Sequence, residues 1–130
     1  MNMTKKTLGF LALLSLVVLA ATSAPAVDLT GTWTGSIDTG DMGVDTLTLV
    51  LKKAGPSYTG TINDSLSLID KDFVITDVKL VGDEFSFIFK AMGGAMEFGL
   101  KLTVNGDKMT GVLVNKAEGQ DLPLEFVRKK

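Results

Sequence analysis

The sequence predicts an all-β protein whose strands form one antiparallel barrel in up-and-down (meander) order. From residue 27 onward, apolar and polar residues alternate with a period of two, which is typical of half-buried strands. Gly, Asp and Asn interrupt this alternation at short intervals, as tight turns between antiparallel strands require. The same segment carries no amphipathic helical pattern.

The first 26 residues have the features of a secretory signal peptide. Two lysines precede an apolar run (8–21), and the small residues of an APA tripeptide (24–26) follow it. We expect cleavage between Ala26 and Val27. The alternative is a retained membrane anchor, which needs about 20 apolar residues and is disfavoured because this run is shorter. A secreted or periplasmic protein without stable membrane insertion is therefore expected, with one domain in residues 27–130.

Composition excludes several classes of function. The chain has no cysteine and no histidine, so it lacks the usual zinc ligands and the commonest general base. Its formal net charge is −2 and its basic residues are scattered, which argues against a nucleic-acid groove. The acidic segments 38–45 and 64–72 lack the spacing of a calcium loop and are interpreted as solvated turns. We expect no enzyme, no metal and no cofactor.

Eight strands are expected, each with an apolar face toward the barrel interior. Their ranges are 31–38, 46–53, 57–63, 73–81, 84–91, 95–104, 108–115 and 122–128. Closing such a sheet covers the apolar face and removes its open edges. A flattened two-sheet sandwich fits the same alternation. The barrel is favoured because the connections are short hairpins in sequence order.

Each strand is justified by the residues on its inward face. Taken in chain order, these are Trp33, Gly35 and Ile37; Leu47, Leu49 and Leu51; Tyr58, Gly60 and Ile62; Val74, Val78 and Leu80; Phe85, Phe87 and Phe89; Met96, Phe98, Leu100 and Leu102; Met109, Gly111 and Leu113; Leu122, Leu124 and Phe126. The opposite face is largely polar.

The turns between the strands carry their own signals. Gly55, Gly82 and Gly106 each lie between two alternating runs and can take positive φ without a steric penalty. The AMGGAM segment (91–96) is expected to be a hairpin loop with Met92 exposed, or alternatively a flexible lip over the barrel mouth. Residues 47–62 also align with 98–113, which fits a weak internal duplication of a hairpin or a chance match of two alternating patterns with a glycine turn.

The segment LTGTW resembles the glycine-x-tryptophan signature on the first strand of the lipocalins and the wider calycin group. In that group, an arginine or lysine of the last strand lies across the tryptophan ring and closes the barrel. Gly31 and Trp33 match the first element, and Arg128 is placed to match the second. The resemblance implies a lipocalin-like barrel in which these three residues close one end. The chain is avidin-sized, but with one tryptophan it lacks the biotin-binding set.

The barrel interior is the candidate ligand site, and the alternative is a packed core. Its expected lining residues are Leu49, Tyr58, Phe85, Phe87, Met96 and Phe98. With Trp33 as a plug, a site should lie toward the opposite mouth, near the AMGGAM loop. The expected function is an exported, non-enzymatic binding module for a small hydrophobic molecule. The alternative is a structural or protein-interaction domain of the cell envelope. Ligand identity and oligomeric state stay open.

Overall fold

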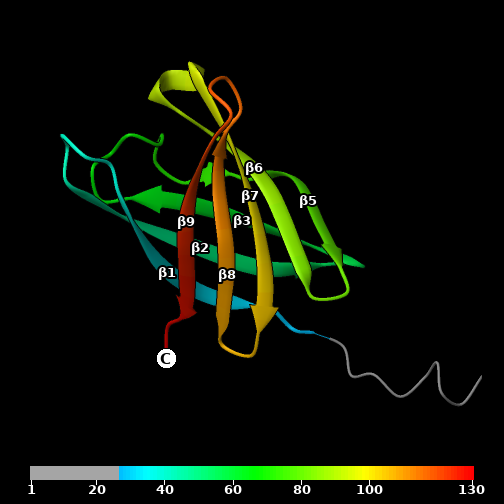
Figure 1. Cartoon of the computed structure of the whole chain (residues 1–130). Coiled ribbons are helices and arrows are strands. Elements are labelled where there is room, and N and C mark those ends of the chain that lie inside the picture. The colour runs from blue at the N-terminus through cyan, green and yellow to red at the C-terminus, as the bar shows by residue number, and fades with distance from the viewer. Residues whose placement is uncertain (1–26) are drawn as a thin grey trace, which may run out of the picture.

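The computed structural model describes residues 27–130, which form a single antiparallel sheet with one 3-10 turn (Figure 1). Its elements are β1 (Gly31–Asp38), β2 (Val44–Ala54), β3 (Ser57–Asp64), β4 (Phe73–Val74), β5 (Thr76–Val81), β6 (Glu84–Ala91), η1 (Met92–Gly94), β7 (Met96–Asn105), β8 (Lys108–Asn115) and β9 (Gln120–Arg128). The expected signal peptide lies outside the described residues. Within the described range, no helix has the length and hydropathy of a membrane span.

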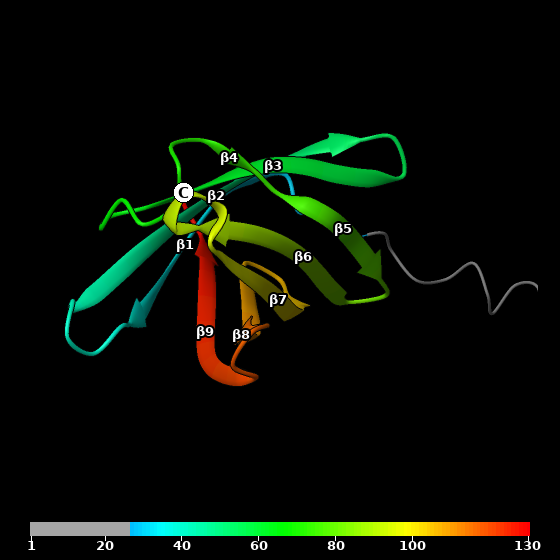
Figure 2. The same ribbon diagram turned by 90° about the horizontal axis from the view of Figure 1, so that it is seen from above.

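The sheet curls into a nearly closed barrel with up-and-down connections (Figure 2). The strand order is β4-β3-β2-β1-β9-β8-β7-β6-β5, so β1 pairs with both β2 and the last strand, β9. The two edge strands, β4 and β5, are consecutive in the chain and separated only by Ile75. The expected all-β, up-and-down antiparallel barrel is therefore confirmed at this level, and the sheet is continuous rather than split into a sandwich.

The expected number of strands is wrong by one, because the segment 73–81 bends and divides into two strands. β4 pairs with β3 and β5 pairs with β6, so this segment changes partner where the two neighbours diverge. Asp77 has a φ of +51° at a register shift between Thr76 and Lys79, a backbone conformation that Asp tolerates better than most residues. The Ile75 N–H still donates to the Gly60 carbonyl, 3.1 Å away, and bridges the break.

The bend also changes which side chains of this segment face inward. Val74 was expected in the interior but is 58% exposed, whereas Ile75 is buried. Elsewhere the period-two alternation holds, and the largest fully buried side chains are Trp33, Phe85, Phe87 and Phe126. The core is therefore built from the inward faces of the long strands.

The two hairpins that align in sequence also have equivalent pairing registers. Leu51 lies opposite Gly60 in the β2–β3 hairpin, and Leu102 lies opposite Gly111 in the β7–β8 hairpin. Both glycines are required by close approach: a Cβ would lie 2.2 Å from the Val50 carbonyl oxygen at Gly60 and 1.8 Å from the equivalent oxygen of β7 at Gly111. The two hairpins therefore have the same pairing register and the same close approach of a carbonyl oxygen to a glycine.

Candidate functional site

Trp33 and Arg128 lie together at one end of the barrel. The Trp33 side chain is fully buried, and its Nε1–H donates to the Leu29 carbonyl oxygen at 3.0 Å. The Arg128 guanidinium carbon lies 4.4 Å from the centroid of the Trp33 ring, within cation–π range. Because β1 pairs with β9 through Trp33 and Arg128, the first and last strands are joined at this point.

Arg128 also holds the segment that leads into β1. Its Nη1 donates to the Thr30 carbonyl at 2.5 Å and its Nη2 to the Asp28 carbonyl at 2.9 Å. Its Nε forms an ion pair with Asp107 at 2.8 Å. Gly31 has a φ of +137°, and a Cβ there would lie 3.4 Å from Arg128 Nη1. Gly31, Trp33 and Arg128 thus have the arrangement that the resemblance implies, and we call this end of the molecule the closed end.

Tyr58 belongs to the closed end as well. Its hydroxyl donates to the Val27 carbonyl and accepts from the Leu29 N–H, both at 3.1 Å. The Tyr58 ring meets the edge of Phe85, with centroids 6.2 Å apart, and Phe85 lies 5.6 Å from Phe87. The ring of Tyr58 on β3 thus meets the aromatic rings of β6 inside the barrel, and this part of the interior is filled.

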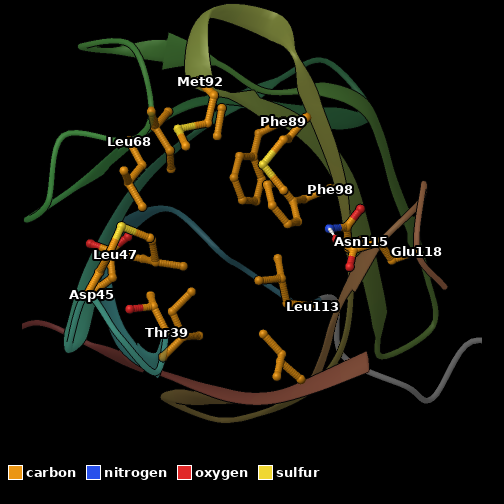
Figure 3. Close-up of a pocket in the computed structure, with 16 residues that line it drawn as sticks. Thr39, Asp45, Leu47, Leu68, Phe89, Met92, Phe98, Leu113, Asn115 and Glu118 are labelled. Carbon is orange, nitrogen blue, oxygen red and sulfur yellow. Dashed lines mark hydrogen bonds between the residues drawn. The ribbon is translucent and has the colours of Figure 1, made fainter. Parts of the chain in front are cut away.

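The opposite end contains a partly open cavity of about 240 Å³ (Figure 3). Its walls come from the inward faces of the strands and from the loops that gather at this end (Figure 1). The apolar lining residues are Ile37, Met42, Leu47, Leu68, Ile69, Phe89, Ala91, Met92, Met96, Phe98, Leu113 and Leu122; the polar ones are Thr39, Asp45, Asn115 and Glu118. We call this the open end.

The structure divides the six expected lining residues between the two ends. Met96 and Phe98 line the cavity, and Phe98 stacks on Phe89 with centroids 5.3 Å apart. The other four, Leu49, Tyr58, Phe85 and Phe87, are buried and do not line the cavity.

Sequence reasoning missed Leu47 and Leu113, although both lie on the inward faces it assigned. Alternation gives the face of a strand but not the height along the barrel, which depends on register.

The AMGGAM loop forms one part of the open end, as the sequence indicated. η1 lies between β6 and β7, with Gly93 at a φ of +66° and Gly94 at +94°. Met92 is 50% exposed and also lines the cavity. Its N–H donates to the Leu68 carbonyl at 2.7 Å, which ties this loop to the segment 65–72. The hairpin-loop interpretation is therefore confirmed.

The segment 65–72 is organised by Asp64 at the end of β3. The two carboxylate oxygens of Asp64 accept from the backbone N–H groups of Leu68, at 2.9 Å, and Ile69, at 3.0 Å. These bonds direct Leu68 and Ile69 into the cavity wall. Asp64 was expected to be a solvated turn residue. Its two hydrogen bonds instead shape the mouth of the barrel.

Asp45 contradicts the solvated-turn interpretation most clearly, because it is only 3% exposed. Its Oδ1 accepts from the Leu66 N–H at 3.1 Å and from the Ser65 hydroxyl at 3.3 Å. Burial raises the pKa of this carboxyl above its ordinary value, and the neighbouring Asp64 raises it further. Among residues 27–130, no group of three or more acidic side chains is placed to hold a metal ion.

Asn115 and Glu118 form the other polar part of the mouth, across the cavity from Asp45 (Figure 3). The Asn115 amide donates from Nδ2 to Glu118 Oε2 at 2.9 Å, and its Oδ1 accepts from the Ala117 N–H at 3.1 Å. This turn is therefore held by its own side chains. The mouth carries polar groups on two sides of an apolar interior.

Two further depressions, of about 460 and 400 Å³, lie on the outer face of the sheet over β5, β6 and β7. Lys79, Ser86 and Lys101 line both of them. Their polar lining makes them weaker candidates for an apolar ligand than the cavity inside the barrel.

The fold and the site define a class: a small all-β protein with a nearly closed antiparallel barrel, plugged at one end and hollow at the other. A comparison with protein-family models finds no match, and a comparison with curated proteins finds no significant similarity in sequence.

Proposed function

We propose that the protein is a non-enzymatic binding module that holds a small hydrophobic molecule in the cavity at the open end. The observation that carries this proposal is an apolar cavity of about 240 Å³ in an otherwise packed interior. Protein interiors are normally filled to crystal-like density, so a cavity with a polar mouth is a binding-site candidate. Half-exposed Met42 and Met92 at its rim offer adaptable apolar contacts to an entering ligand.

The proposal extends to the calycin-like character and the export of the protein. The barrel topology and the contact of Arg128 with Trp33 support a lipocalin-like barrel domain over residues 27–130. A cut between Ala26 and Val27 would leave the contacts of Val27 and Leu29 with Tyr58 intact. These points support a secreted or periplasmic protein whose signal peptide is removed.

Titration calorimetry with octan-1-ol tests the proposal, since the eight-carbon chain of this neutral ligand is similar in size to the cavity. Saturable 1:1 binding is expected. Ala91→Leu should lower the affinity at least tenfold, because Ala91 is buried against the cavity and a larger side chain fills it. Ala54→Leu is the matched control, since Ala54 is exposed at the end of β2. Absence of saturable binding, or equal effects of the two variants, contradicts the proposal.

The alternative function is a structural or protein-interaction module. The filled closed end favours it, because Trp33, Tyr58 and Phe85 leave no room for a ligand there. Under this alternative, Ala91→Leu would raise the stability by filling a void and no ligand would bind. The same calorimetric experiment therefore separates the two functions.

A further inference from the structure

The polar groups at the mouth of the cavity identify the chemistry of the ligand more closely. Asp45 and Glu118 are the charged residues among those that line the cavity, and no lysine or arginine is among them. Lys116 lies next to Asn115 in the sequence but pairs with Glu97 at 3.3 Å. The mouth of the cavity is therefore negatively charged.

Asp45 lies where a ligand head group would be. It is buried at the rim, and both of its hydrogen-bond donors, from Ser65 and Leu66, contact the same oxygen, Oδ1. Within residues 27–130 no hydrogen-bond donor contacts its second oxygen. Every buried side-chain oxygen of these residues has a hydrogen-bond partner, so the second oxygen of Asp45 is reached by solvent, and a cationic donor at the mouth can contact it.

The raised pKa of Asp45 also favours a cationic head group at the mouth. Burial and the neighbouring Asp64 both disfavour its ionised form and raise its pKa. A cation bound beside Asp45 would offset both effects. A carboxylate head group would add a third negative charge between Asp45 and Glu118, and like charges at close range are destabilising.

The volume of the cavity limits the apolar part of the ligand. A cavity of about 240 Å³ has room for about eight water-sized groups at roughly 30 Å³ each. A methylene group is of similar size, so an eight-carbon chain fills the cavity. The apolar walls around Leu47, Phe89 and Leu113 suit such a chain.

We propose that the cavity binds small amphiphilic amines, with the apolar chain inside the barrel and the protonated amino group at the mouth beside Asp45. This inference rests on the proposed function, since it specifies the ligand class of the same cavity. An ammonium group carries three donors and can donate to the accessible oxygen of Asp45, while Glu118, on the opposite side of the mouth, adds negative charge (Figure 3).

The test compares three ligands that share an eight-carbon chain: octylamine, octan-1-ol and octanoate. Titration calorimetry of the purified protein at neutral pH is expected to rank the amine first, with octanoate at least tenfold weaker, a difference of about 1.4 kcal/mol. If octan-1-ol or octanoate binds as tightly as the amine, the amine proposal is overturned while the binding function stands. If none of the three binds, the proposed function itself fails.

Two variants locate the effect at the mouth. Asp45→Asn keeps an acceptor for Ser65 and Leu66 but removes the charge, so the affinity for octylamine should fall about tenfold while that for octan-1-ol changes less than twofold. Glu125→Gln removes a charge from the exposed outer face of β9 and should change neither. If Asp45→Asn does not fold, Glu118→Gln at the exposed side of the mouth replaces it. Equal loss for amine and alcohol overturns the proposal.

Discussion

At the closed end of the barrel, Trp33 and Phe85 fill the interior, whereas at the open end Leu47 and Leu113 surround a cavity of about 240 Å³. The same strands build both ends. Along β2, for example, Leu49 is packed in the core and Leu47 lines the cavity only two residues away. The difference therefore arises from the side chains and loops that surround each level of the barrel, not from the strands themselves.

The two ends also differ in how their polar groups are used. At the closed end, Arg128 and Tyr58 donate to backbone carbonyls of the entry segment 27–30, so their polar atoms are occupied by the chain itself. At the open end, Asp45 is buried and only one of its oxygens accepts hydrogen bonds. The polar side chains of the closed end thus hold the chain together, whereas the open end retains a carboxylate oxygen that a ligand can reach.

The largest expected loss of stability comes from removing the Trp33 side chain, which plugs the closed end. Trp33→Ala is expected to lower the free energy of unfolding by about 3–5 kcal/mol, because it removes a fully buried ring and leaves a void under Arg128. Urea unfolding monitored by far-UV circular dichroism measures the change. Val127→Ala, at an exposed position on β9, is the control and should stay within about 0.5 kcal/mol. An unchanged midpoint for Trp33→Ala would show that Trp33 is not a plug.

A matched pair on β2 sharpens the comparison between the ends. Leu49→Ala should cost about 4 kcal/mol and Leu47→Ala about 2 kcal/mol, both within the range for buried leucines. Leu47 borders a cavity, so its truncation forfeits fewer contacts than truncation of Leu49. Urea unfolding of the two variants side by side measures the gap. Equal costs would mean that the open end is packed as tightly as the closed one.

Arg128 tests whether the closed end depends on geometry or on charge. Arg128→Ala should cost about 2 kcal/mol, since it removes two hydrogen bonds to backbone carbonyls and the contact with Trp33. Arg128→Lys keeps the charge but not the planar fork and should recover less than half of this loss.

Asp107→Ala serves as the control for the Arg128 variants. It removes the ion pairs of an exposed carboxylate with Arg128 and Lys130 but keeps the guanidinium, and it should cost less than about 1 kcal/mol. Thermal unfolding of all three variants measures the differences. Full rescue by lysine would contradict a role for the guanidinium geometry.

Much of this architecture could be predicted from local sequence. Alternation assigned the inward faces of the long strands, and Gly55, Gly82 and Gly106 all adopt positive φ at the turns between them. The bend at Ile75 could not be predicted in this way. It depends on β3 and β6 diverging, which is a property of the closed sheet rather than of the segment 73–81.

The cavity lies at the end where a site was expected, and of the six expected lining residues only Met96 and Phe98 line it. The position of Trp33 indicated which end is closed, whereas the height of each inward residue depends on register, which alternation does not supply. Asp45 did carry a signal, because it continues the inward alternation of Leu47 and Leu49. Its interpretation as a turn residue followed from the acidic segment around it, and its burial depends on Leu66 and Ser65 folding over it.

The pH dependence of stability tests the open end with the smallest expected effect. Because burial and Asp64 raise the folded-state pKa of Asp45 above its ordinary value of 3.8, the folded state binds the proton more tightly than the unfolded state. The contribution of Asp45 is therefore fully present below pH 3.8 and is lost as the pH rises through the raised folded pKa. Asp45→Asn should unfold at a higher urea concentration than the wild type at pH 7, and this gap should close as the pH approaches 3.8. A gap in urea midpoint that does not change with pH would show that the folded state does not disfavour the ionised form of Asp45. Asp41→Asn, at an exposed position in the adjoining loop, controls for the change in net charge.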